Sequence, residues 1–179
     1  LLGGSIEVKS RLNEGSVFEF SLPIKVAYEE AAEEEKEEGD ALAGNRDIAR
    51  DILKDLPILL VEDNEINAEL TQLILSDYGA NIIDWAHDGQ EALEMYSTSE
   101  PSHYKLIIMD LRMPVMDGLT ATRKIRSLHR VDASIVPIIA ISADAYEEDI
   151  RKCREAGMQC HVSKPVEVDK LMRAIKDLI

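Results

Sequence analysis

Residues 106–118 read LIIMDLRMPVMDG, and this stretch decides how the rest of the chain is interpreted. Its first four residues are apolar, which is too few for a buried helix and suits a strand covered on both faces. Asp110 follows at once, at the carboxyl edge where open parallel sheets bind their ligands. Pro114 and the Asp117-Gly118 pair then specify an ordered turn. The stretch predicts a buried parallel strand that ends in a carboxylate beside a tight loop.

Further apolar strand candidates lie on both sides of this stretch and alternate with helical spacing. The strand candidates are 58–61, 81–86, 106–109, 135–141 and 159–162. The residues at helical spacing are Ile66, Leu70, Leu73 and Ile74; Leu93 and Tyr96; Ala121, Ile125 and Leu128; Ile150 and Cys153; and Val168, Leu171, Met172 and Ile175. Five β–α units with short connections predict an α/β fold: a doubly wound, five-stranded parallel sheet with helices on both faces. Residues 57–179 are enough for one such domain.

The part before this domain has a different character. Residues 1–26 contain two alternating stretches around a turn signal at 13–16, which predicts a β-hairpin. An isolated hairpin is marginal in water, so we expect it to be the end of a larger domain. Residues 27–56 are predicted to be an acidic, self-repelling linker followed by a short helix before Pro57. Because the chain begins without Met, we expect a fragment of a longer protein.

Composition excludes several classes of protein. The formal net charge of −15 argues against a nucleic-acid surface, which needs clustered Lys and Arg. No apolar run reaches the roughly 20 residues of a membrane span, so we expect no membrane contact by this fragment. The two cysteines, Cys153 and Cys160, suit a reducing compartment. We therefore expect a cytoplasmic fragment, whether or not the parent protein is anchored in a membrane.

Polar residues follow four of the five predicted strands. They are Glu62 and Asp63, Asp110, Ser142 and Lys164. Singly, each has an ordinary interpretation, since an Asp or Ser can cap the next helix and a Lys can be a solvated surface charge. Together they lie on one rim, where the carboxyl ends of parallel strands converge. We therefore predict a single site at that edge.

The chemistry of this set is restricted. Three carboxylates in one place repel one another unless a cation neutralises them. Oxygen ligands without His or Cys favour a hard ion such as Mg²⁺. A carboxylate beside Mg²⁺ and a lysine can act as a nucleophile and form an aspartyl phosphate, and Ser142 offers a hydroxyl to a phosphate oxygen.

Four motifs carry a resemblance to a known family. The sequences VEDN at 61–64, MDLRMPVMDG at 109–118, ISADA at 141–145 and SKP at 163–165 resemble the receiver domain of two-component response regulators. The resemblance implies the flavodoxin-like sheet order 2-1-3-4-5 and a cis bond between Lys164 and Pro165.

The same resemblance implies a role for each site residue. Asp110 would accept a phosphoryl group from a phosphohistidine, with Lys164 and Ser142 contacting that group. The implied ligands of Mg²⁺ are Asp63, Asp110, the backbone carbonyl of Arg112 and, through water, Glu62. Ser142 and His161 hold the two switch positions, and His161 departs from the Tyr or Phe usual in the family.

A second resemblance concerns the N-terminal part. GGSIEVKS at 3–10 and GSVFEFSLP at 15–23 resemble the last strands of the ATP-binding domain of sensor histidine kinases. Together the two resemblances imply a hybrid histidine kinase with a fused C-terminal receiver. The fragment lacks the ATP-binding motifs and the phosphoacceptor histidine, so by itself it would catalyse only its own aspartyl phosphorylation. The implied partners are the kinase dimerisation and phosphoacceptor domain and a histidine phosphotransfer domain.

Two alternatives remain open at this point. The first is a receiver that docks its partners without being phosphorylated. The second is a Mg²⁺-dependent aspartyl phosphatase, although such enzymes commonly carry a second acid two residues after the nucleophile, where this chain has Arg112.

Overall fold

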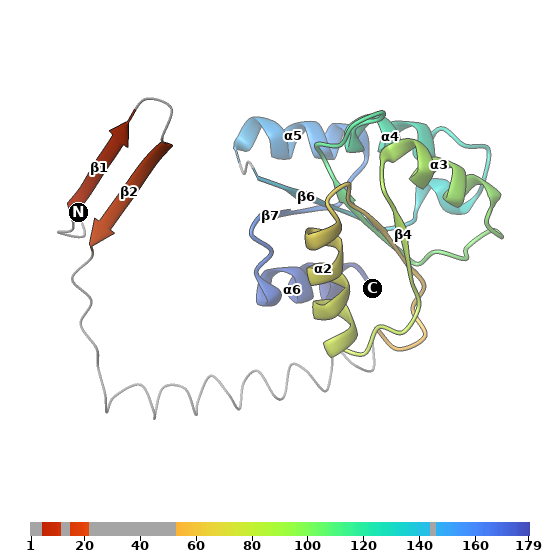
Figure 1. Ribbon diagram of the computed structural model, residues 1–179. Helices are drawn as coiled ribbons and strands as arrows, with labels where there is room; N and C mark the ends of the chain where they lie inside the picture. The colour runs from red at the N-terminus through yellow and green to blue at the C-terminus, as the bar shows by residue number, and fades with distance from the viewer. Residues whose placement is uncertain (1–4, 12–14, 22–52, 144–145) are drawn as a thin grey trace. The chain divides into compact units, whose positions relative to one another are not determined.

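The computed structural model describes residues 5–11, 15–21, 53–143 and 146–179 (Figure 1). The chain divides into two units, residues 1–42 and 43–179, which are described separately. The predicted linker, and the predicted short helix up to residue 52, lie outside the described residues. Leu53 and Leu56, which end that segment, are both buried in the second unit.

The first unit contains the predicted hairpin. Strands β1 (Ser5–Arg11) and β2 (Gly15–Ser21) pair antiparallel, with Val8 opposite Phe18. An exposed ion pair of 3.9 Å joins Lys9 and Glu19 across the two strands.

The second unit is the predicted α/β domain. Its strands are β3 (Ile58–Val61), β4 (Ile83–Ala86), β5 (Leu106–Asp110), β6 (Ile138–Ser142) and β7 (Cys160–Ser163). Its helices are α2 (Glu65–Asp77), α3 (Gly89–Thr98), α4 (Gly118–Arg126), α5 (Glu147–Ala156) and α6 (Val168–Leu178), with a short 3-10 helix η1 (Asp132–Ser134). All strand pairs are parallel and the order is β4-β3-β5-β6-β7. Counted along this unit, that order is 2-1-3-4-5, which confirms the expectation.

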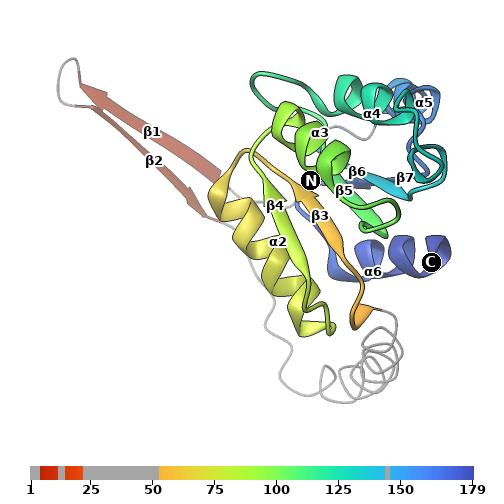
Figure 2. The ribbon, with the colours of Figure 1, turned by 90° about the vertical axis from the view of Figure 1, so that its right-hand side faces the viewer.

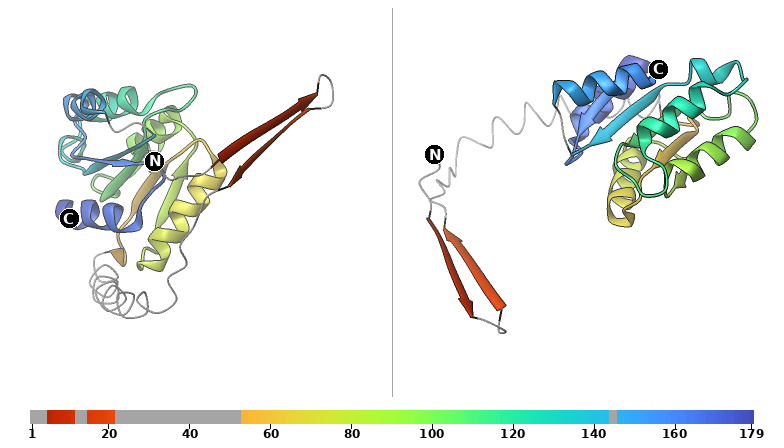
Figure 3. Two further views of the ribbon diagram at one scale, coloured as in Figure 1. Left: turned by 90° about the vertical axis from the view of Figure 1, so that its left-hand side faces the viewer. Right: turned by 90° about the horizontal axis from the view of Figure 1, so that it is seen from above.

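The central strands are buried on both faces, as their apolar sequences predict. Leu59 and Val61 of β3 face one core, together with residues from α3, α4 and α5. Ile58 and Leu60 face the other core, together with residues from α2 and α6. The ribbon views show the same two layers, with α3, α4 and α5 over one face of the sheet and α2 and α6 over the other (Figures 2 and 3).

Helix α2 differs from the simplest expectation. Ile66, Leu70 and Leu73, whose spacing predicts the helix, are 75%, 51% and 60% exposed. The helix instead buries Ala68, Thr71 and Leu75. The large apolar side chains Ile66, Leu70 and Leu73 therefore lie on the outer face of the helix. The spacing predicts the helix correctly but does not mark its buried face.

Two strands begin two or more residues later than their apolar stretches suggest. The 135–141 stretch becomes a strand only at Ile138, because residues 132–134 form η1 and Ile135 is 70% exposed. The 81–86 stretch becomes a strand at Ile83, since Asn81 instead exchanges hydrogen bonds with Asp55. Within the described ranges, no helix is both long and apolar enough to cross a bilayer.

Candidate functional site

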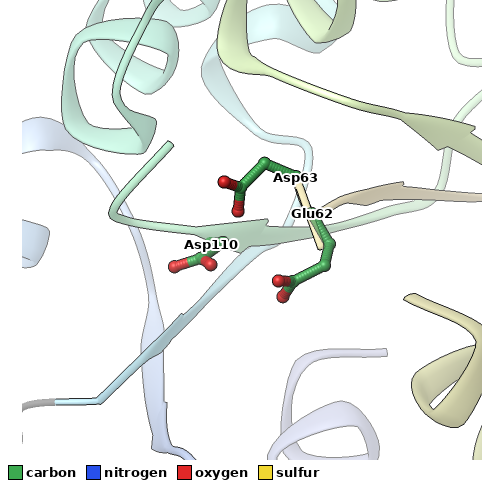
Figure 4. A group of neighbouring side chains, drawn as sticks. All are labelled: Glu62, Asp63 and Asp110. Carbon is green, nitrogen blue, oxygen red and sulfur yellow. The ribbon is translucent and has the colours of Figure 1, made fainter. Parts of the chain in front are cut away.

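Three carboxylates meet at the carboxyl edge of the sheet. Glu62 and Asp63 follow β3, and Asp110 ends β5, the neighbouring parallel strand, where Val61 lies opposite Met109. One oxygen from each carboxylate can be chosen so that all three lie within 4.8 Å of one another (Figure 4). Glu62 and Asp110 are only 4% and 5% exposed, whereas Asp63 is open to solvent. The strand register brings the acidic residues that follow β3 beside the end of β5.

Lys164 reaches the same place from the loop after β7. Its Nζ donates to Oε2 of Glu62 at 2.7 Å and to Oδ2 of Asp110 at 2.6 Å. Burial alone would lower the pKa of Lys164, but the hydrogen bonds to Asp110 and Glu62 and the charges of these two acids outweigh it, so the pKa is raised. The lysine therefore stays charged at neutral pH. The bond between Lys164 and Pro165 is cis, as the family resemblance implies.

The loop after β5 folds back onto Asp110. The backbone N–H of Arg112 donates to Oδ1 of Asp110 at 3.0 Å, which fixes the second oxygen of that carboxylate. Asp117 caps α4 by accepting from the N–H of Thr120 at 2.8 Å. A Cβ on Gly118 would lie 2.1 Å from the backbone oxygen of Asp110, so only glycine fits there. The MDG motif thus provides both a helix cap and close backbone packing beside the carboxylate.

Ser142 and His161 lie on the two strands that follow. Ser142 ends β6 and is buried, one residue beyond the Ile141 that pairs with Asp110. Its Oγ and Nε2 of His161 lie 2.8 Å apart and are hydrogen-bonded. Burial lowers the pKa of His161, against a smaller raising effect of Asp149. The imidazole is therefore neutral at pH 7 and is tied to the hydroxyl at the site.

Two residues that the sequence did not assign to the site hold Glu62. Asn67 Nδ2 donates to Oε1 of Glu62 at 3.0 Å, and Trp85 Nε1 donates to its backbone carbonyl at 2.8 Å. Asn67 could have been found from its spacing, because it lies in the first turn of α2, four residues after Asp63. Nothing in the sequence around Trp85 indicates its contact, which depends on how β4 pairs with β3.

The arrangement suits a hard cation and a phosphoryl group. Within the described residues, the ammonium of Lys164 forms ion pairs with two of the three carboxylates, those of Glu62 and Asp110. The donor set is made of oxygen atoms alone, which suits Mg²⁺. Asp110 presents a carboxylate that contacts this ammonium and lies beside the other two acids, and this arrangement suits the transfer of a phosphoryl group to a carboxylate oxygen.

Comparison with known proteins agrees with this geometry. Residues 58–176 match the response regulator receiver domain family. The chain is 40% identical over 116 residues to the osmosensing histidine protein kinase SLN1 of Saccharomyces cerevisiae, covering 64% of this chain and 9% of SLN1. It is 28% identical over 192 residues to the sensory/regulatory protein RpfC of Xanthomonas campestris pv. campestris, covering 99% of this chain and 26% of RpfC.

A solved structure gives the same result. The receiver domain of the sensor histidine kinase PA1611 from Pseudomonas aeruginosa PAO1, crystallised with magnesium coordinated in its active site cleft, is 35% identical. It superimposes with a TM-score of 0.61, covering 69% of this chain and 96% of that one. Sheet order, strand-end residues and family match therefore agree, and the chain belongs to the response regulator receiver domain family.

Proposed function

We propose that Asp110 is the phosphoacceptor of a two-component relay and takes its phosphoryl group from a phosphohistidine on a partner. An oxygen of Asp110 forms the new bond to phosphorus as the bond from phosphorus to the imidazole nitrogen breaks, and the electron pair stays on the imidazole. The observation that carries this proposal is the position of the Asp110 carboxylate, which is buried and contacts Lys164 at 2.6 Å. Lys164 and the Ser142 hydroxyl would stabilise charge on the transferred group.

We propose Mg²⁺ as the cofactor of this site. Asp63, Asp110 and the backbone carbonyl of Arg112 would be its direct protein ligands, with Glu62 acting through water. The ion, when bound, supplies the positive charge that the carboxylates and the incoming phosphoryl oxygens both require. The support is the cluster of three carboxylates and the magnesium reported in the PA1611 receiver.

We also propose that the parent is a hybrid histidine kinase. Residues 1–26 would be the end of its ATP-binding domain, 27–56 the linker and 57–179 the receiver. The match to RpfC covers 99% of the chain, the hairpin included, which supports this division. The chain spans between 7% and 26% of the length of its curated relatives, so the activity of the whole protein belongs to this proposal.

The outer face of α2 gives the partner a place to dock. Ile66, Leu70 and Leu73 are exposed, and the helix that carries them begins two residues after Asp63. A domain that delivers a phosphoryl group to Asp110 has to contact the surface beside the site. We assign these three side chains, the α2 patch, to the histidine-bearing phosphodonor, either the kinase dimerisation domain or a histidine phosphotransfer domain.

Phosphorylation of the purified chain tests the proposed reaction. With a small phosphodonor and Mg²⁺, the intact mass should increase by one phosphoryl group, and Asp110→Asn should abolish the increase. No mass increase in the wild type would favour a receiver that docks without being phosphorylated. Sustained turnover of phosphomonoesters would instead favour the phosphatase.

The α2 patch is tested separately by comparing two donors. Leu70→Ser should slow phosphotransfer from a phosphohistidine domain by about tenfold or more, because it removes an exposed apolar contact from the docking face. It should leave phosphorylation by the small donor unchanged, since that reaction needs no docking. Equal rates for wild type and variant with the protein donor would exclude the patch.

A further inference from the structure

The side chain of Glu62 is held on both of its oxygens. Oε1 accepts from Nδ2 of Asn67 at 3.0 Å, and Oε2 accepts from Nζ of Lys164 at 2.7 Å. Its backbone is fixed as well, because its N–H donates to the carbonyl of Ala86 and its carbonyl accepts from Trp85. Among these partners Asn67 is the contribution of α2, and it is a neutral donor.

Asn67 is itself well positioned. Its backbone N–H donates to Oδ1 of Asn64, the N-cap of α2, at 3.1 Å. Its carbonyl accepts from the hydroxyl of Thr71 at 2.9 Å, and Thr71 is buried under the helix. The first turn of α2 therefore presents the Asn67 amide to Glu62 from a fixed backbone, so the contact does not depend on a mobile side chain alone.

The neutrality of Asn67 matters at this site. A second cationic donor, in addition to Lys164, would orient Glu62 but would also cancel more of the negative charge that attracts a metal ion. An amide orients the carboxylate and leaves its charge available. With Oε1 occupied by Asn67, Oε2 is directed to Lys164, and that contact keeps the ammonium between Glu62 and Asp110.

We propose that Asn67 is a positioning residue of the magnesium site, which sets the affinity for Mg²⁺ by fixing the orientation of Glu62. This inference rests on the proposed function. Without the amide, Oε1 of a carboxylate that is 4% exposed loses its partner. The carboxylate then turns to satisfy both oxygens from Lys164, which draws the ammonium away from Asp110. Loss of outer partners at a metal site typically weakens metal binding about 10–100-fold, and because Asn67 acts on the ion one contact further out, through Glu62, we expect an effect at the lower end of that range.

The test measures Mg²⁺ affinity in the full chain. Asn67→Leu removes the donor at similar volume, and Gln72→Leu, which removes an amide elsewhere on α2, is the matched control. Trp85 is the one tryptophan in the sequence and contacts the Glu62 carbonyl, so its fluorescence can follow the titration, with calorimetry as a second measure. We expect the dissociation constant to rise about tenfold or more for Asn67→Leu and to be unchanged for Gln72→Leu.

Phosphorylation gives a second readout. The rate with a small phosphodonor should fall for Asn67→Leu at low Mg²⁺ and recover at saturating Mg²⁺, because the positioning role acts on metal affinity. A lowered melting temperature in EDTA with an unchanged dissociation constant would show a purely structural role and overturn the inference.

If Asn67→Leu fails to fold, Asn67→Asp tests whether loss of the amide donor weakens or strengthens Mg²⁺ binding. An extra, partly exposed carboxylate strengthens cation binding by roughly fivefold at most, which is less than the loss expected from the missing donor. We therefore expect weaker Mg²⁺ binding, and tighter binding would overturn the inference.

A wild-type chain that shows no response to Mg²⁺ would overturn the proposed function and this role together, whereas a normal wild-type response that Asn67→Leu leaves unchanged would overturn this role alone.

Discussion

Buried charged groups lie at both ends of the sheet, but they are balanced in sign at the amino end and mostly negative at the carboxyl end. At the amino end, Arg130 precedes η1 and Asp132 begins it, and both contact the end of α3 or the segment between α3 and β5. Asp132 accepts two bonds from Arg130, at 3.0 and 2.8 Å, one from the N–H of Ser102 at 2.7 Å and one from the hydroxyl of Tyr96 at 3.1 Å. Arg130 also donates to the carbonyl of Ser99 and lies over the ring of Tyr96. We call Tyr96, Arg130 and Asp132 the amino-edge cluster.

The carboxyl end has an excess of one sign. Among the described residues, the ammonium of Lys164 contacts Glu62 and Asp110, and Asp63 has neither a hydrogen bond nor an ion pair. A balanced cluster gains its stability from contacts within the chain. An unbalanced one leaves electrostatic repulsion that a cation can relieve. The comparison indicates that the amino-edge cluster stabilises the fold, while the acidic site gives up stability for binding.

The largest expected effect comes from breaking the balanced cluster. Arg130→Leu leaves the buried carboxylate of Asp132 without its cation, which typically costs about 3–5 kcal/mol. Urea denaturation of the isolated chain measures this loss. The Mg²⁺ dissociation constant, measured on the fraction that stays folded, should not change. A loss below about 1 kcal/mol would show that the amino-edge cluster does not stabilise the fold in this way.

The next largest effect is expected at Gly118, where the backbone approaches that of Asp110 closely beside the acidic site. Gly118→Ala places a methyl group 2.1 Å from the backbone oxygen of Asp110 and 2.9 Å from Cγ of Met109, so the loop or the strand end must move. Overpacking of this kind costs about 1–3 kcal/mol. Because the same shift moves Asp110, the rate of phosphorylation should fall as well. An unchanged denaturation midpoint would show that the loop adapts freely.

The acidic site could be predicted from the sequence, because its residues lie at the ends of predicted strands. A short apolar run indicates a strand, and parallel strands bring their carboxyl ends to one edge. Glu62, Asp63, Asp110, Ser142 and Lys164 therefore needed only the strand order to be placed together. The roles of these residues in metal binding and phosphorylation stay predictions.

The amino-edge cluster could not be predicted in the same way. Asp132 contacts Tyr96 and Ser102, which lie 36 and 30 residues earlier, and no periodicity in the sequence indicates that these segments meet. The buried face of α2 could not be predicted from the sequence for a related reason. Spacing groups the apolar residues of a helix, but the size of the gap between helix and sheet decides whether small or large side chains fill it.

Relieving the repulsion at the acidic site should stabilise the fold. Asp63→Asn removes one of three like charges without breaking a hydrogen bond among the described residues, so in EDTA we expect a gain of about 0.5–2 kcal/mol. The rise in melting temperature that Mg²⁺ gives the wild type by binding the folded state should be lost. Glu69→Gln, which neutralises an exposed acid on α2 away from the site, should keep that rise. Destabilisation by Asp63→Asn in EDTA would contradict the view that this site sacrifices stability.

The smallest expected effect is on the pH dependence of stability, which should differ between the acidic site and the amino-edge cluster. Burial lowers the pKa of His161, so between about pH 6.5 and its lower folded value the unfolded chain binds more protons than the folded one. Stability should therefore fall as the pH falls through that window. His161→Phe should flatten the slope between pH 5 and 8 in urea denaturation, whereas His129→Gln, at an exposed position, should keep it.

The amino-edge cluster should respond only in stronger acid. Its hydrogen bonds from Arg130 lower the pKa of Asp132, so its contribution is present above the ordinary Asp range near pH 3.9 and is lost as the pH falls below it. Two separate losses are thus expected on acidification, the first from the site end and the second from the amino end. The loss at higher pH is assigned to protonation of His161, and the loss at lower pH to protonation of Asp132. A single transition that His161→Phe does not alter would therefore show that His161 does not contribute to the pH dependence of stability.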